Sequence, residues 1–195
     1  MQLPYHYLEI EDYAKLKDED FWLTDRLISF ASLMLRKQYP SVGGLLDTTR
    51  AKCKGRSRFM YIPGEVIQIM CVNDNHWVVA ARLKGQIVIY DSLAIVHHPL
   101  DSAILSQLKS LFIPSEEHQM FDQFSVVMGE IATRQIGSSD CGLFAIAIAH
   151  LLCRGESPEH KYLLQNLMRH HLFKCVFEIG EILPFPCAAS GKIQA

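Results

Sequence analysis

Three consecutive apolar segments in the middle of the chain constrain its fold most strongly. They span residues 66–72, 76–83 and 86–91 and are rich in Val and Ile, which favour β-strands. Lys84-Gly85 separates the last two segments, and two residues are the length of a tight hairpin turn. The pattern therefore predicts antiparallel strands, with the start of one strand and the end of the next at the same edge of a sheet.

Helical patterns lie on both sides of this strand region. Apolar residues recur every three or four positions in residues 21–38, and residues 100–112 repeat the pattern. The apolar run after Asp140 predicts a buried helix, and residues 158–175 predict another before a terminal tail. Residues 124–130 predict a further strand. Together these patterns indicate an α+β fold, in which helices flank a central mixed or antiparallel sheet.

The composition fits one globular domain over residues 1–195. The chain has 195 residues, 49% of them hydrophobic, and a formal net charge of -2. Such a chain can bury a substantial core. Its near neutrality argues against non-specific binding to nucleic acid or acidic lipid. Residues 50–58 alternate cations with small residues, which is typical of a solvated loop, and a nucleic-acid site is the alternative for this segment.

Cysteine and histidine spacing argues against a disulfide-stapled protein and against a zinc protein. The six cysteines include no C-x-x-C pair, which is typical of reduced intracellular thiols rather than of a disulfide framework. The pairs His97-His98 and His170-His171 lack partners at zinc-ligand spacing, so we expect no metal and no cofactor. The N-terminus lacks a signal-peptide pattern, and no apolar run is long enough to span a membrane. We expect a soluble cytoplasmic or nuclear protein.

The segment QIGSSDCGLFAIAIAH, residues 135–150, changes from small polar residues to an apolar run at Cys141. A buried structural thiol is the common interpretation of such a cysteine. Here, however, turn and cap residues precede Cys141 and place it in the first turn of a helix. Unpaired N–H groups and the positive end of the helix dipole favour a thiolate there. Gly142 leaves space beside the sulfur for another backbone.

The predicted sheet supplies partners for a cysteine nucleophile. His76 stands at the head of one strand and Asp91 at the tail of the next, so the hairpin brings them to one edge. This pair can accept and orient the proton of Cys141. Gln135, six residues earlier, can donate an amide N–H to an oxyanion together with the backbone N–H of Cys141. Singly, a strand histidine and a turn-capping aspartate have structural interpretations, but the whole set indicates nucleophilic catalysis.

The order of these motifs resembles the ubiquitin-like protease family of cysteine peptidases. The matching order is His-Trp, then Asp-Ser, then Gln followed six residues later by Asp-Cys-Gly. Residues 22–25, Trp-Leu-Thr-Asp, resemble that family's Trp-Leu-Asn-Asp motif, with Thr24 in place of Asn. That family includes the SUMO-specific proteases and has the adenovirus protease as a distant relative. The resemblance covers residues 20–150, leaves residues 158–195 as a C-terminal helix and tail, and implies the Ulp type of papain-like fold.

The same resemblance implies a mode of substrate binding. In that family two tryptophans line a tunnel for the extended Gly-Gly tail of a modifier, and the two tryptophans of this chain, Trp22 and Trp77, occupy those motifs. The resemblance implies that both tryptophans clamp the tail and that Asp25 meets a basic group of the modifier. Gly142, beside the sulfur, is a further candidate for substrate contact. Because only glycine fits between indole walls, such a tunnel selects Gly-Gly by excluding side chains.

The implied activity is that of a monomeric thiol isopeptidase. It would cleave after the C-terminal Gly-Gly of ubiquitin or of a ubiquitin-like modifier, with SUMO and NEDD8 among the candidates. Residues 43–47 and 170–186 resemble family members found beside transposon-type genes, which leaves the modifier open. An acyltransferase that passes an acyl group to lysine or serine is one alternative. A non-catalytic modifier-binding module is the other.

Overall fold

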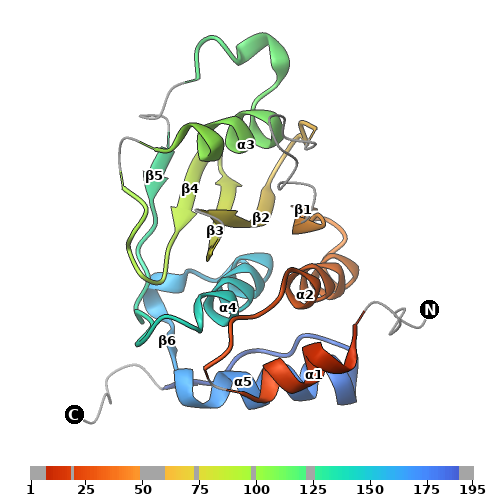
Figure 1. The fold of residues 1–195 in the computed structure, drawn as a ribbon. Coiled ribbons are helices and arrows are strands. Elements are labelled where there is room, and N and C mark those ends of the chain that lie inside the picture. Colours follow the sequence, from red (N-terminus) through yellow and green to blue (C-terminus); the bar gives the residue numbers. More distant parts are fainter. Residues whose placement is uncertain are drawn as a thin grey trace.

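Figure 1 shows the fold in a computed structural model of the protein. The structure describes residues 8–18, 20–48, 60–72, 75–97, 100–121 and 126–188. The helices are α1 (Ile10–Lys17), α2 (Asp25–Gln38), α3 (Ser102–Phe112), α4 (Cys141–Cys153) and α5 (Gln165–Lys174). The strands are β1 (Gly43–Gly44), β2 (Val66–Val72), β3 (His76–Leu83), β4 (Gln86–Tyr90), β5 (Val126–Met128), β6 (Tyr162–Leu163) and β7 (Cys187–Ala188).

The central sheet is mixed and has helices on both faces. Its strand order is β1-β2-β3-β4-β5, in which β2, β3 and β4 are antiparallel neighbours. The outer strands β1 and β5 pair in parallel with β2 and β4. Helix α3 covers one face, α2 and α4 cover the other, and α1 and α5 form a further layer beyond α2 and α4 (Figure 1). The predicted α+β fold with a flanked mixed sheet is confirmed.

A tight turn aligns β3 with β4 as the sequence predicts. Leu83 pairs with Gln86 across Lys84 and Gly85, whose φ angles are 50° and 81°. Two positive φ angles give a turn that matches the right-handed twist of a hairpin, and glycine adopts such an angle at little cost. The resulting register carries the start of β3 and the end of β4 to one edge of the sheet.

Alternating residues of β3 contribute to two hydrophobic cores, one on each face. Trp77 and Val79 pack with residues of α2 and α4, whereas Val78 and Ala80 pack with residues of α3. Helix α4 is apolar on nearly all sides, and residues 141–152 are all buried because the sheet, α2 and α5 enclose it. This enclosure fixes the helix and therefore the position of its first residue.

Helix α2 begins later than the predicted start at Phe21. Its first residue is Asp25, and Thr24 is its N-cap, with Oγ1 accepting a hydrogen bond from the backbone N–H of Leu27 at 3.2 Å. The same Oγ1 donates to the carboxylate of Asp12 in α1 at 2.5 Å. The cap and its partner in α1 thus outweigh the apolar spacing, which continues upstream of the helix. The sequence patterns did not predict α1.

The single helix predicted over residues 158–175 is wrong. A 3₁₀ turn, Pro158–His160, leads into β6, and α5 follows before the chain continues as a π-helical turn at Cys175–Ile179. Strand β6 pairs with β7, which lies in the segment predicted to be a tail. In that segment Phe185 is buried. Pairing between segments far apart in the chain determines this arrangement, and no local pattern reveals it.

The other predicted elements are confirmed, some of them with shifted ends. Helix α3 begins at Ser102 because Asp101 caps it, with Oδ1 accepting from the N–H of Ala103 at 2.7 Å. Strand β5 occupies part of residues 124–130, and the basic segment, residues 50–58, lies outside the described residues. Within the described ranges no helix is long and apolar enough to cross a membrane. The same ranges contain no cluster of three or more His, Cys, Asp or Glu residues suited to a metal ion.

Candidate active site

Cys141 is the first residue of helix α4, in the first turn as the sequence predicts. It is buried, with 1% of its surface exposed. The unpaired N–H groups of a first helical turn and the positive end of the helix dipole lie at this position. Asp140 occupies the N-cap position, but its carboxylate makes no capping bond to the helix. It therefore does not compete for the N–H groups beside the sulfur.

His76 and Asp91 meet at the sheet edge that the hairpin predicts. His76 begins β3, Asp91 directly follows β4, and His76 Nε2 lies 2.6 Å from Asp91 Oδ1. Both side chains are buried. Since Nε2 faces the carboxylate, Nδ1 is the ring nitrogen left for the thiol, and Cys141 is near enough to contribute to the raised pKa of His76.

This arrangement raises the affinity of His76 for its proton. Burial alone lowers the pKa of His76, but hydrogen bonds to Asp91 and Cys141 and the charges of both groups outweigh burial and raise the pKa to about 9. Burial likewise opposes ionisation of Asp91, yet hydrogen bonds from His76 and from backbone N–H groups lower its pKa to about 2. At neutral pH the thiol therefore lies beside an imidazolium that an ionised carboxylate stabilises.

Asp91 is at once a turn cap and the partner of His76. Its Oδ1 accepts a second hydrogen bond, from the backbone N–H of Leu93 at 2.9 Å. Its Oδ2 accepts from the N–H groups of Ile95 at 2.8 Å and Val96 at 2.9 Å. The loop after β4 therefore fixes the carboxylate, and the carboxylate in turn orients the imidazole.

Ser92 fixes the amide of Gln135, which the sequence predicts as an oxyanion donor. Gln135 is buried, and its Oε1 accepts a hydrogen bond from Ser92 Oγ at 2.6 Å. Its Nε2 donates to the carbonyl of Gly137 at 2.9 Å. Among the described residues no acceptor takes the second N–H of this amide. Sequence reasoning missed the role of Ser92, although its position directly after Asp91 was the available signal.

The two tryptophans differ in exposure. Trp22 lies ahead of α2 and is 45% exposed. Trp77 follows His76 in β3, is 5% exposed, and belongs to the same core cluster as Cys141. Asp25 is partly exposed at the start of α2. Contact of these side chains with a substrate stays a prediction, and Trp22 offers the larger surface for it.

Gly142 lies where α4 approaches the start of α2. A Cβ at this position would meet Leu23 Cβ and Ile28 Cδ1, each at 3.0 Å. The missing side chain therefore serves close packing within the chain, and a contact of Gly142 with substrate stays a prediction. This packing brings the segment that carries Trp22 next to the helix that carries Cys141.

Comparison with known families assigns this chain to a class of enzyme. The model of the Ulp1 protease family, C-terminal catalytic domain, matches residues 65–178. The chain belongs to the Ulp1 protease family. It is therefore a cysteine protease, and the matched region of this Ulp1-family protease contains His76, Asp91, Gln135 and Cys141. Trp22 and Asp25 precede that region.

Solved structures show that the Ulp1-family protease shares its fold with SUMO proteases. SUMO protease Ulp1 with its catalytic cysteine oxidised to a sulfonic acid aligns with a TM-score of 0.69 at 18% identity, over 90% of this chain and 86% of that one. The C-terminal Ulp1 protease domain in complex with Smt3, the yeast ortholog of SUMO, aligns with a TM-score of 0.63 at 14% identity, over 87% and 82%. No curated protein matches the sequence.

Proposed function

We propose that this Ulp1-family protease is a thiol isopeptidase that cleaves after the C-terminal Gly-Gly of ubiquitin or of a ubiquitin-like modifier of the SUMO class. One observation carries the proposal, namely the buried array in which Asp91 orients His76 beside Cys141. The array combines a nucleophile, a proton donor and an orienting carboxylate in the order that acyl transfer requires. Ubiquitin-like modifiers supply the matching substrate, because their conjugates are joined through the carbonyl of a terminal glycine.

In the first half of the reaction the Cys141 thiolate attacks the carbonyl carbon of the terminal glycine. The negative charge that develops on the carbonyl oxygen is stabilised by the backbone N–H of Cys141 and by the N–H of Gln135 that Gly137 leaves unused. His76 then gives its proton to the lysine nitrogen, and the C–N bond breaks. The products are a neutral amine and a thioester on Cys141.

In the second half water hydrolyses the thioester. His76 is neutral after the first step, and it accepts a proton from the attacking water. The tetrahedral intermediate collapses, the C–S bond breaks, and Cys141 leaves as a thiolate. This step restores the pair of thiolate and imidazolium and releases the modifier with a free glycine carboxylate.

Substrate selection rests on the residues ahead of α2 and on β3. Trp77 shares a hydrophobic cluster with Cys141, and Trp22 directly precedes Leu23, which packs beside Gly142. Indole walls at these positions admit a glycine tail while excluding larger side chains. Asp25 supplies a negative charge that suits a basic group on the modifier. A protein of the same fold has been solved in complex with Smt3, the yeast ortholog of SUMO, and this supports a SUMO-class modifier.

Covalent labelling tests this proposal. Ubiquitin, SUMO and NEDD8 with a C-terminal propargylamide are incubated with the wild type, with Cys141→Ala and with Cys153→Ala. Cys153 ends the same helix, and burial raises the pKa of its thiol to about 12, so it is a matched control. We expect an adduct with one modifier in the wild type and in Cys153→Ala but not in Cys141→Ala.

Three results would reject the proposal. An adduct that persists in Cys141→Ala would remove Cys141 from the mechanism. Absence of any adduct, together with acyl transfer from an acyl-CoA donor, would assign the same residues to an acyltransferase. Binding of a modifier without an adduct would instead indicate a non-catalytic module.

A further inference from the structure

The loop between Gln135 and Cys141 has little burial to hold it in place. Ile136, Gly137 and Ser138 are exposed, and Ile136 is 84% exposed. The proposed reaction nevertheless requires both ends of this loop to be fixed in position, because Gln135 and Cys141 must direct their N–H groups to one oxygen. Some other part of the molecule must therefore fix the loop.

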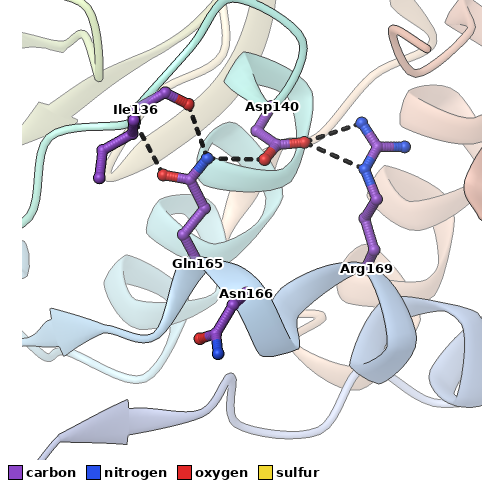
Figure 2. Close-up of a pocket in the computed structure, with 5 residues that line it drawn as sticks. All are labelled: Ile136, Asp140, Gln165, Asn166 and Arg169. Carbon is purple, nitrogen blue, oxygen red and sulfur yellow. Dashed lines mark hydrogen bonds and ion pairs between the residues drawn. The ribbon is translucent and has the colours of Figure 1, made fainter. Parts of the chain in front are cut away.

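Gln165, the first residue of α5, holds the start of this loop. Its Oε1 accepts from the backbone N–H of Ile136 at 2.8 Å, and its Nε2 donates to the carbonyl of Ile136 at 2.8 Å. Nε2 also donates to Asp140 Oδ2 at 2.7 Å. As Figure 2 shows, one amide side chain thus reaches the residue after Gln135 and the residue before Cys141.

Arg169, one helical turn further along α5, holds the end of the loop. Its Nε and a terminal guanidinium nitrogen lie 3.1 and 2.7 Å from Asp140 Oδ1 (Figure 2). The two side chains of this ion pair are largely buried, at 9% and 14% exposure. Residues four apart lie on one helix face, so Gln165 and Arg169 act on the loop together. Because Asp140 binds them, its carboxylate does not cap α4.

Arg169 also reaches the segment that carries Trp22. It donates to the carbonyl of Phe21 at 2.7 Å and to the carbonyl of Lys15 in α1 at 3.2 Å. Phe21 directly precedes Trp22, as Asp140 directly precedes Cys141. One guanidinium therefore joins the backbone beside the proposed tail-binding indole to the side chain beside the nucleophile.

We propose that Gln165 and Arg169 are positioning residues for the oxyanion donors, and that Arg169 additionally sets the distance between Trp22 and Cys141. The inference rests on the proposed function, in which Cys141 attacks the glycine carbonyl and Gln135 stabilises the oxyanion. Neither residue touches the reacting atoms. Gln165 acts on transition-state stabilisation, and Arg169 acts on both stabilisation and substrate binding.

Gln165→Ala is the first test, with Asn166→Ala as the matched control. Asn166 is the neighbouring residue of α5 and lines the same pocket, and its side chain has no hydrogen bond to the other four residues drawn (Figure 2). The assay uses the modifier that labels the wild type, now carrying a fluorogenic amide at its C-terminus in place of the propargylamide. We expect Gln165→Ala to lower kcat about tenfold with little change in KM, because a misplaced oxyanion donor weakens only the transition state. Asn166→Ala keeps the wild-type values.

Alkylation of Cys141 by iodoacetamide separates positioning from general damage. Alkylation displaces iodide at a methylene carbon and forms no oxyanion, so its rate in Gln165→Ala should equal the wild-type rate. Equal losses in kcat and in alkylation rate would indicate a disturbed nucleophile and overturn the inference. An unchanged kcat would overturn it as well, whereas a wild type that neither cleaves nor labels would reject the proposed function itself.

Arg169→Lys tests whether Arg169 sets the distance between Trp22 and Cys141. Lysine keeps the charge opposite Asp140 but cannot bridge Asp140 and the two carbonyls with a planar fork. We expect kcat to fall about tenfold and KM to rise severalfold, since the donors and the tail-binding segment both shift. A fall in kcat without a change in KM would remove the role in placing Trp22. A variant with the kinetics of the wild type would overturn the role of Arg169 altogether.

Discussion

Helix α4 carries a cysteine at each end, and each end also has a buried histidine. At the N-terminal end Cys141 lies beside His76, whose pKa is raised to about 9. At the C-terminal end Cys153 follows His150, burial raises the pKa of the Cys153 thiol to about 12, and burial with the nearby Arg154 charge lowers the pKa of His150 to about 4. The same two residue types thus occur at both ends, with a histidine of raised pKa at one end and a histidine of lowered pKa at the other.

Burial does not explain the difference, because His76 and His150 are each 2% exposed. The difference in pKa comes from the group that each imidazole binds. His76 Nε2 faces the carboxylate of Asp91, whereas His150 Nε2 lies 2.9 Å from the neutral hydroxyl of Tyr39. The negative end of the helix dipole would favour a protonated His150, but such an effect is worth only about 0.3–1 kcal/mol and burial outweighs it. A buried carboxylate is therefore what makes one end of α4 suited to proton transfer.

The largest effect on activity is expected for His76→Gln, with His150→Gln as the matched comparison. His76→Gln removes the proton donor and should lower kcat/KM on a fluorogenic ubiquitin-like substrate by about 10⁴-fold. His150→Gln should leave kcat/KM near the wild-type value and lower the free energy of unfolding by about 1–3 kcal/mol, because it disturbs a buried hydrogen bond to Tyr39. Comparable activity losses in both variants would refute the contrast between the ends of α4.

Asp91→Asn tests whether the carboxylate creates that contrast. Without its charge the pKa of His76 drops, so kcat/KM should decrease by about 10³-fold at neutral pH. In the wild type kcat/KM should decline as the pH rises through about 9, where the imidazolium loses its proton. In Asp91→Asn this alkaline decline should move to lower pH.

Asp101→Asn is the control for that variant, since Asp101 also caps a backbone N–H but has no histidine partner within the described structure. Its pH profile should match the wild type. An alkaline limb that stays in place in Asp91→Asn would show that Asp91 does not govern the proton of His76.

Gln135→Ala should have an intermediate effect, because it removes one oxyanion donor while the N–H of Cys141 remains. We expect kcat to fall about 10²-fold and KM to change little, as steady-state kinetics would show. Gln38→Ala removes an amide that bonds to the backbone of Ile182 away from the site, and it should retain wild-type kcat. A decrease confined to substrate affinity in Gln135→Ala would count against the oxyanion role.

Ser92→Ala should have the smallest effect. It removes a single hydrogen bond that orients the Gln135 amide, which is worth about 1 kcal/mol and corresponds to a decrease of about fivefold in kcat. Ser110→Ala, which removes an exposed hydroxyl bonded within α3, is the control. If kcat of Ser92→Ala equals that of the control, the amide of Gln135 does not depend on Ser92.

Local patterns predicted the parts of the fold that local physics determines. The bounds of β2 and β3 agree with the sequence prediction, and β3 ends at a tight turn whose residues, Lys84 and Gly85, have positive φ. Cys141 was placed correctly because small cap residues precede a continuous apolar run. The pairing of His76 with Asp91 followed from the hairpin register alone.

The parts that were missed depend on contacts between distant segments. The start of α2 is set by Thr24 and its bond to Asp12, and β6 forms only because β7 returns to it. Ser92 and Gln135 come from different segments and meet only in the folded chain. Likewise nothing in the sequence around Arg169 indicates that its guanidinium reaches Asp140.

The contrast between His76 and His150 is tested most directly by a pH titration of the histidine side chains by ¹H–¹⁵N NMR, with both residues assigned from the spectra of His76→Gln and His150→Gln. We predict that His76 stays protonated through neutral pH and titrates near 9, while His150 stays neutral until the pH approaches 4. A His76 that titrates near the ordinary histidine value of about 6.5, or together with His150, would contradict this prediction.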